Sequence, residues 1–211
     1  MTERKPSRQL WKGLLACSSL TGALLLATPL FALDYDEAID GDLSEDPAAP
    51  TALALDLGSN RVSGRVDGSA DIRDYLTFDI REGQSLLSLI LIEYVDETLP
   101  FIPGNRGYHA FFDGATSLIP DIDNAPSFMG GDHLDALPSG TDLLPILASA
   151  PLAGVGFEAP LGPGTYTYHL QQTSPSPTRY ALDFVVVPEP STAVLLLMGL
   201  ALMRPSRRSA V

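Results

Sequence analysis

The central part of this chain lacks lysine and cysteine. Residues 33–190 contain neither, because Cys17 is the only cysteine among the 211 residues and every lysine lies nearer the amino terminus. Disulfide bonds and a cysteine nucleophile are therefore excluded for this part of the chain. Its fold has to be held by a hydrophobic core without covalent cross-links.

Catalytic signatures are missing as well. The histidines His109, His133 and His169 have no partner at ligand spacing, so we expect surface residues rather than metal ligands. No H-E-x-x-H motif, G-x-S-x-G motif or glycine-rich phosphate loop occurs. We therefore predict that the protein is not an enzyme. A carboxylate-dependent hydrolase remains an alternative, since carboxylates are abundant.

Positive charge is scarce in the same region. Residues 33–190 hold six arginines and 25 acidic residues, which gives a net charge of −19. Such a surface repels phosphate backbones, so nucleic acid is excluded as a partner. It also attracts divalent cations, although solubility or adaptation to salty water explains the charge more simply.

The amino terminus has the layout of a secretory signal peptide. Basic residues at positions 4, 5, 8 and 12 precede an apolar stretch over residues 13–31. We predict export by the Sec machinery and cleavage after Ala32, with Ala27 as the second choice. An uncleaved membrane anchor is the alternative. A lipoprotein signal at Cys17 is rejected, because the apolar run before it is only four residues long.

The carboxyl terminus combines a short motif, an apolar stretch and a basic end. Pro188, Glu189 and Pro190 are followed by a 12-residue apolar stretch (192–203) and by the arginine cluster Arg204, Arg207 and Arg208. As a helix this stretch is roughly 18 Å long, against about 30 Å of hydrocarbon in a bilayer. It suits a transient membrane tether. The basic residues at both ends of the chain favour the cytoplasmic side for both ends.

This tail resembles the PEP-CTERM sorting signal of bacteria with an outer membrane and extracellular polysaccharide. The resemblance implies that Pro188, Glu189 and Pro190 are recognised by exosortase, a membrane protease-transpeptidase. They would be substrate residues of that enzyme, with the arginine cluster stopping transfer. A retained membrane anchor is the alternative.

Acidic residues gather at the start of the mature chain, between Asp34 and Asp46. No register there fits the spacing of an EF-hand, so we predict a solvated acidic lead-in. Asp71 and Asp74 are weak candidates for a calcium site at the edge of a sheet. The preferred interpretation places both in a turn facing water.

Alternating apolar residues predict an all-β fold, an antiparallel sandwich of the jelly-roll type. The expected strands are 52–57, 61–66, 74–80, 86–92, 108–112, 165–171 and 180–186. The uninterrupted apolar run 86–92 predicts a central strand covered on both faces. Residues 96–151 are rich in glycine, proline and aspartate, and predict long loops with one short helix near 142–147.

Two segments resemble the halves of a bacterial pre-peptidase C-terminal (PPC) domain, a small β-sandwich. They are residues 71–84, with Asp71, Asp74 and Tyr75, and residues 161–184, with the Gly162-Pro163-Gly164 turn. The predicted organisation is a signal peptide (1–32), an acidic lead-in with a first strand (33–60), a PPC-like sandwich (61–187) with an insertion (96–151), and a sorting signal (188–211).

The function that these patterns favour is that of a noncatalytic envelope or extracellular-matrix protein. It would be structural or adhesive, associated with anionic polysaccharide through bridging cations. A calcium-binding or carbohydrate-binding module is an alternative. For the latter, the sugar-stacking candidates are Tyr75, Tyr94, Tyr108, Tyr166 and Tyr168.

Overall fold

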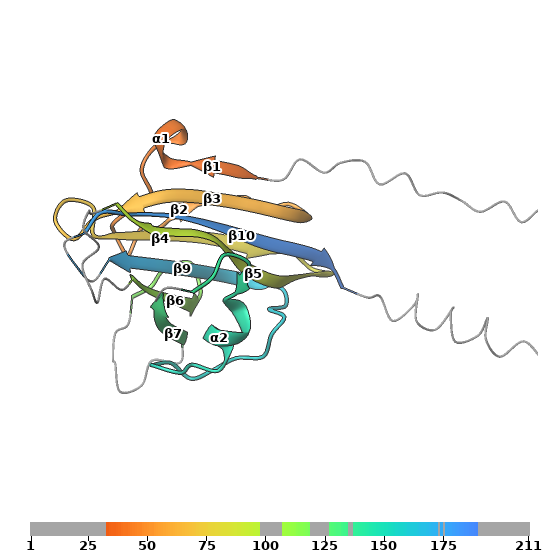
Figure 1. Ribbon diagram of the computed structural model, residues 1–211. Coiled ribbons are helices and arrows are strands. Elements are labelled where there is room, and N and C mark those ends of the chain that lie inside the picture. Colours follow the sequence, from red (N-terminus) through yellow and green to blue (C-terminus); the bar gives the residue numbers. More distant parts are fainter. Residues whose placement is uncertain are drawn as a thin grey trace, which may run out of the picture.

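The structure, a computed structural model, describes residues 33–97, 107–118, 127–134, 137–172, 174 and 176–189. The expected signal peptide, the apolar tail, Pro190 and the cluster Arg204, Arg207 and Arg208 lie outside the described residues. Within them, two five-stranded sheets stack face to face (Figure 1). No helix in this described part is long and apolar enough to cross a membrane.

The first sheet has the strand order β1-β3-β10-β5-β8 and the second the order β2-β4-β9-β6-β7. The first sheet consists of β1 (Asp34–Asp36), β3 (Gly58–Val66), β10 (Thr178–Pro188), β5 (Gln84–Asp96) and β8 (Thr141–Asp142). The second consists of β2 (Thr51–Ala52), β4 (Arg73–Ile80), β9 (Gly164–Gln172), β6 (Gly107–Asp113) and β7 (Phe128–Leu134). Two short helices, α1 (Glu37–Asp40) and α2 (Leu144–Ala148), complete the described elements.

The β-sandwich expected from the sequence is confirmed, but its sheets are mixed. The long strands pair antiparallel, whereas β1 pairs parallel with β3 and β2 pairs parallel with β4. β1 lies in the segment from Asp34 to Asp46, which the sequence analysis took for a solvated lead-in. The expected strand 52–57 is wrong over most of its length, since β2 ends at Ala52 and residues 53–57 are not a strand. Residues 33–60 therefore add an edge strand to each sheet.

Alternation along the strands builds the core between the sheets. In β4, the even-numbered Leu76, Phe78 and Ile80 are buried, as the period of two predicts. β9 and β10 follow the same rule and contribute Tyr166, Tyr168, Leu170, Tyr180, Leu182, Phe184 and Val186 to the core. Phe78 contacts Phe184 edge to face at 5.4 Å between ring centroids, so the two sheets meet through aromatic rings.

The prediction that both faces of 86–92 are covered is wrong. Leu89 and Leu91 face the core, but the outer face of β5 is open and Leu87 is 51% exposed there. An apolar run without alternation is equally compatible with a strand covered on both faces and with a strand whose outer face is apolar and exposed to solvent. The strand itself is confirmed and is longer than expected.

Residues 96–151 hold more regular structure than the long loops that were predicted. The short helix is confirmed as α2, whose Leu144 and Leu147 join the core. β7 was missed because it contains Gly130 and Gly131, which weaken a strand signal. A Cβ atom on Gly130 would collide with the backbone carbonyl of Leu147, so the glycine lets α2 approach β7 closely.

The histidines are not surface residues as a group. His169 faces away from the inter-sheet core, as alternation predicts, but it is only 7% exposed and stacks on Tyr75 at 4.5 Å. His109 is fully buried, and its Nδ1 lies 3.1 Å from the hydroxyl of Tyr168. Burial lowers the pKa of both histidines to about 3, so both are neutral in the folded protein at pH 7.

Of the five tyrosines expected to stack on sugars, three are buried, and Tyr94 and Tyr108 are half-buried. Tyr75, Tyr166 and Tyr168 are at most 8% exposed, and Tyr168 belongs to the inter-sheet core. The three buried rings therefore stabilise the fold and cannot form an open surface for stacked sugar rings.

Candidate metal centre

Four carboxylates from distant parts of the sequence converge at one edge of the sandwich. They belong to Glu37 in α1, Asp42 after α1, Asp71 in the loop before β4, and Asp74 in β4. One ligand atom from each lies within 4.8 Å of those of the other three. We call these four side chains the acidic cluster. The weak candidates Asp71 and Asp74 are thus brought together, and Glu37 and Asp42 were missed as their partners.

Glu37 is held in the acidic cluster by backbone donors from two directions. The backbone N–H of Leu43 donates to its Oε1 at 3.1 Å, and that of Arg65 donates to its Oε2 at 2.8 Å. Both carboxylate oxygens are therefore oriented before any ligand arrives. The bond from Arg65 also ties the lead-in segment to β3, whereas the bond from Leu43 lies within that segment.

A glycine in β3 makes room for this carboxylate. A Cβ atom on Gly64 would collide with the carboxylate of Glu37 and with the hydroxyl of Tyr180. The backbone of Gly64 is extended, so the requirement is for space and not for an unusual φ. No sequence signal other than a glycine within a predicted strand pointed to this contact.

Replacement of Gly64 by alanine is expected to push Glu37 out of the acidic cluster. The affinity for a bound cation should fall about tenfold or more, the usual effect of disturbing one ligand or its support. Calorimetric titration of the Gly64→Ala variant measures this. Gly162→Ala is the matched control, because a Cβ there would find nothing nearer than 3.9 Å. Equal affinities in the two variants would contradict the role given to Gly64.

Asp71 is placed by a tight turn between β3 and β4. The carboxylate of Asp67 accepts backbone N–H bonds from Ser69 at 2.8 Å and Ala70 at 2.7 Å, an Asx turn. The backbone N–H of Asp67 then donates to the carbonyl of Asp71 at 2.6 Å. These bonds fix the loop, and Oδ1 of Asp71 is left buried without a hydrogen-bond donor.

Asp74 is the most unusual member of the acidic cluster. It is 1% exposed, its Oδ2 accepts a hydrogen bond from the Tyr180 hydroxyl at 2.7 Å, and its Oδ1 has no hydrogen-bond partner. A buried carboxylate oxygen without a donor is costly unless a proton or a cation binds it. The prediction that Asp74 faces water in a turn is wrong. The alternation in the sequence already indicated the inward direction of Asp74, because it lies two and four residues before the inward-facing Leu76 and Phe78.

Burial and mutual repulsion make the acidic cluster easy to protonate. Burial raises the pKa of Asp71 to about 7, and the charge of Asp42 adds to this effect. Burial, and next the charge of Glu37, raise the pKa of Asp74 well above its ordinary value. The pKa of Glu37 is also raised, again mainly by burial. Without a cation, the fold therefore keeps protons on carboxyls that are ionised in ordinary exposed positions.

The chemistry of these donors fits calcium best. Calcium takes six to eight oxygen ligands at about 2.3 to 2.6 Å, so two ligands on opposite sides of one ion lie roughly 5 Å apart. The spread of 4.8 Å in the acidic cluster matches that limit. Zinc prefers nitrogen and sulfur, which the acidic cluster lacks, and magnesium usually retains several waters instead of an all-protein cage.

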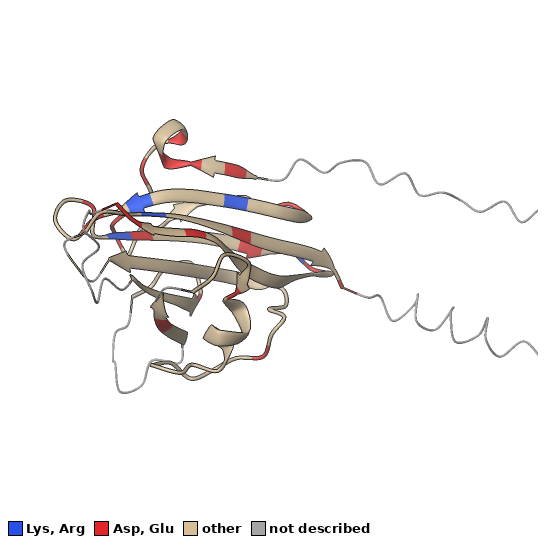
Figure 2. Ribbon diagram, in the orientation of Figure 1, with Lys and Arg blue, Asp and Glu red and all other residues tan. Residues whose placement is uncertain are grey.

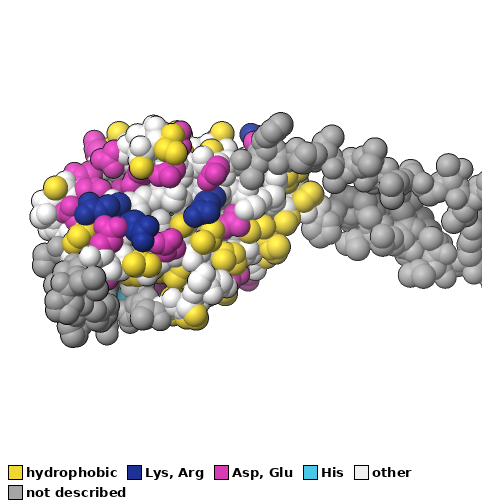
Figure 3. All heavy atoms as spheres, turned by 45° about the horizontal axis from the view of Figure 1, so that its top comes forward, with side chains coloured by type: hydrophobic (Ala, Val, Ile, Leu, Met, Phe, Trp, Pro, Cys, Tyr) yellow, Lys and Arg dark blue, Asp and Glu magenta, His cyan; other side chains and the backbone are white. Residues whose placement is uncertain are grey.

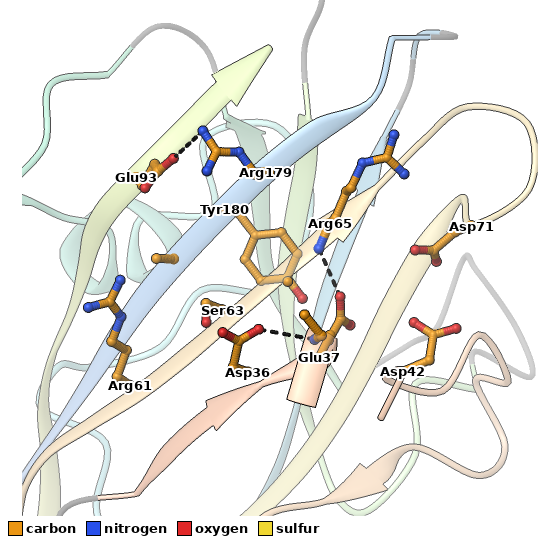
Figure 4. A pocket seen from close by; sticks show the side chains of 13 residues that line it. Asp36, Glu37, Asp42, Arg61, Ser63, Arg65, Asp71, Glu93, Arg179 and Tyr180 are labelled. Atoms are coloured by element: carbon orange, nitrogen blue, oxygen red, sulfur yellow. Dashed lines mark hydrogen bonds and ion pairs between the residues drawn. The ribbon is translucent and has the colours of Figure 1, made fainter. Parts of the chain in front are cut away.

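The acidic cluster lies at the wall of an open groove of about 480 Å³ on the outer face of the first sheet. Figure 4 shows the carboxylate of Glu37 beside the hydroxyl of Tyr180, with Asp42 and Asp71 on one side of Glu37 and Arg61 on the other. Figure 3 looks onto this face, where arginine and acidic side chains intermix. The ribbon in Figure 2 shows acidic positions along β1, α1 and the following segment.

The described part of the expected sorting motif, Pro188 and Glu189, lies at the opposite end of β10. Pro188 is the last residue of that strand and pairs with Gln84, and the backbone N–H of Glu189 donates to Gly83 at 2.8 Å. Both residues are exposed. The motif therefore follows the folded part without an intervening linker.

Comparisons with known proteins yield structural neighbours only. No family model matches the chain, and no curated protein matches it. One neighbour is the pre-peptidase C-terminal domain of collagenase from Bacillus anthracis, 16% identical, covering 64% of this chain and 93% of that one, with a TM-score of 0.31. A second is PliG from Salmonella Typhimurium, a periplasmic inhibitor of g-type lysozyme, 16% identical, covering 64% and 97%, with a TM-score of 0.31.

A TM-score of 0.31 is too low to transfer a function or a detailed topology from either neighbour to this chain. The β-sandwich architecture stands on the strand order and register of this chain itself. The PPC resemblance of residues 71–84 and 161–184 stays a prediction from the sequence.

Proposed function

We propose that this chain is an exported, noncatalytic β-sandwich that binds one calcium ion in the acidic cluster. It would act as a structural or adhesive component of a polysaccharide-rich envelope or extracellular matrix. The ion would tie the lead-in segment, through Glu37 and Asp42, to the body of the sandwich, through Asp71 and Asp74.

A single observation carries the calcium assignment. Four carboxylates offer ligand oxygens within 4.8 Å of one another, and one of these carboxylates, that of Asp74, has a buried Oδ1 without a hydrogen-bond partner. Simple solubility explains exposed carboxylates, but it does not explain a buried carboxylate that shares a small volume with three others. A cation satisfies Asp74 and relieves the repulsion within the acidic cluster at once.

Calcium affinity is expected to rise with pH between about 5 and 8. The pKa of Asp71 is raised to about 7 in the folded state, so the ion has to displace protons below that pH. For this group, the stability of the cation-free protein is greatest below the unfolded pKa of about 4 and is lost as pH rises through about 7. Calcium therefore stabilises the protein most on the alkaline side.

Calorimetric titration of the full chain with calcium, in a non-ionic detergent, tests the proposal. We expect one ion per chain, weaker binding of magnesium, and a heat at pH 7 that depends on the ionisation enthalpy of the buffer, since protons are released. Millimolar calcium that gives neither heat nor proton release at pH 8 would refute the site.

Export through the Sec machinery and sorting by exosortase rest on the sequence of the two ends. One feature of the fold supports this part of the proposal. β1 begins and β10 ends at the same end of the sandwich, because β1 runs parallel and β10 antiparallel to β3 (Figure 1). Both flanking segments can then reach one membrane while the sandwich lies outside it.

Fractionation of the producing bacterium tests the delivery. The sandwich is expected outside the inner membrane, and replacement of Pro188, Glu189 and Pro190 by alanine should leave the unprocessed chain in the inner-membrane fraction. If that variant reaches the same fraction, at the same mass, as the unaltered protein, exosortase does not recognise this motif.

The geometry favours a noncatalytic role over the hydrolase alternative. The carboxylate atoms of the acidic cluster lie closer together than the roughly 5 to 5.5 Å or more that separates the carboxyls of glycosidases. The hydrolase hypothesis placed its carboxylate pair on residues 96–151. The acidic cluster lies outside that range, between residues 37 and 74.

A further inference from the structure

The groove beside the acidic cluster has the size of a small-ligand site. Its volume of about 480 Å³ lies within the range of about 300 to 1,000 Å³ typical of ligand pockets. Its floor consists of the small residues Ser63, Gly64 and Ala181, which leave the space above β3 and β10 open. No large apolar side chain is exposed in it, since Tyr180 is 2% exposed.

The acidic cluster opens into this groove. Glu37, Asp42 and Asp71 line it, while Asp74 lies buried beneath them. An ion held by these four carboxylates is therefore covered on the side of Asp74 and faces the groove on the other. Because calcium takes six to eight oxygens, groups of a ligand in the groove can complete its shell.

Most arginines of the groove are already paired, and one is not. Arg179 is bound to Glu93 at 3.2 Å and to Glu97 at 2.8 Å, and Arg65 is bound to Glu97 at 2.9 Å. Arg61 makes no ion pair with any residue that the structure describes, and its exposed side chain lines the groove on the side away from Asp42 and Asp71 (Figure 4). It offers up to five donors to a ligand.

Local charge decides which ligand fits. Five acidic and three basic side chains line the groove, so that with ionised Asp74 beneath and one divalent ion present its net charge is −1. The folded body around it carries a large negative charge as well. A polyanion is repelled by such a groove. This argues against the bridged anionic polysaccharide expected from the sequence.

We propose that the groove binds a neutral glycan in a calcium-dependent manner. Two adjacent hydroxyls of the sugar would coordinate the ion through their oxygens and donate hydrogen bonds to carboxylates of the acidic cluster. Arg61 would donate a hydrogen bond to a further sugar oxygen. Hydroxyl groups both donate and accept, so a mixed lining of carboxylates and a guanidinium satisfies them. A protein ligand would need an apolar anchor pocket, which this groove lacks. The inference rests on the proposed calcium site.

Titration of the full chain with neutral gluco-, manno- and galacto-oligosaccharides tests the proposal, with oligogalacturonate and polylysine as charged probes. A polyoxyethylene detergent avoids the sugar headgroups of maltosides. We expect binding of at least one neutral series in calcium, none in EDTA, and none of the charged probes. The Arg61→Gln variant should bind about tenfold more weakly, because it loses a charged donor.

The matched control is Arg81→Gln, an exposed arginine outside this groove that pairs with Asp56 at 3.8 Å. It should bind as the unaltered chain does, and both variants should keep the heat of calcium binding, which shows that they fold. If the chain gives a heat of calcium binding but binds none of the neutral oligosaccharides, the glycan site is refuted and the calcium site is retained. Binding that persists in EDTA, that is unchanged in Arg61→Gln, or that prefers a charged probe would overturn it too. Absence of calcium heat would instead remove the calcium site on which it rests.

Discussion

Replacement of Asp74 by asparagine is expected to abolish the stabilisation of this protein by calcium. At a calcium concentration 100 times Kd, the unaltered protein gains about 2.7 kcal/mol. For a domain of this size that gain corresponds to a rise in Tm of roughly 5 to 10 °C. The asparagine side chain would keep an oxygen for the Tyr180 hydroxyl but would lose the charge that binds the ion.

The same substitution is expected to cost little when calcium is absent. The carboxyl of Asp74 is buried with a raised pKa, so asparagine replaces a group that the cation-free fold already keeps close to neutral. Thermal unfolding with calcium and with EDTA separates the two effects. Asp113→Asn, at an exposed end of β6, is the matched control and should keep the full calcium-dependent rise. If Asp74→Asn keeps that rise, the acidic cluster does not bind the ion.

Truncation of Phe184 to alanine is expected to cost about 3 to 5 kcal/mol of unfolding free energy. Phe184 is 0% exposed on β10, and it contacts Phe78 from the opposite sheet and Tyr168 on β9. Its removal leaves a cavity where the two sheets meet. Urea unfolding at saturating calcium measures the loss.

The neighbouring Val185 supplies the control for this truncation. It points to the outer face of the first sheet and is only half-buried, so Val185→Ala should cost about 1 kcal/mol or less. Equal losses at the two positions would mean that β10 does not present its even-numbered residues to the core. The register of the whole first sheet would then be wrong.

The long strands could be predicted from the sequence because they alternate. Leu76, Phe78 and Ile80 in β4 fall on one face, and the face that the pattern predicts as buried is the buried one. β7 and the short edge strand β1 were not predicted, and β2 was met only at Ala52, the first residue of the expected strand 52–57. Their pairing is set by tertiary contacts, such as the approach of α2 to Gly130, and not by local preference.

The acidic cluster could be predicted only in part. Asp71 and Asp74 are close in sequence, so their shared site could be suspected. Glu37 and Asp42 lie far earlier in the chain, and what brings them there is the parallel pairing of β1 with β3 and the space above Gly64. Neither feature leaves a local pattern. The inward direction of Asp74 did follow from alternation, yet a carboxylate at a core-facing position is easily mistaken for the end of a turn.

A crystal structure of the protein grown with calcium tests the central claim most directly. We expect one strong peak bound by oxygens of Glu37, Asp42, Asp71 and Asp74 at about 2.3 to 2.6 Å, with an open side toward the groove. Saturating calcium with no peak among these four carboxylates, or a peak that leaves Asp74 without a contact, would contradict it.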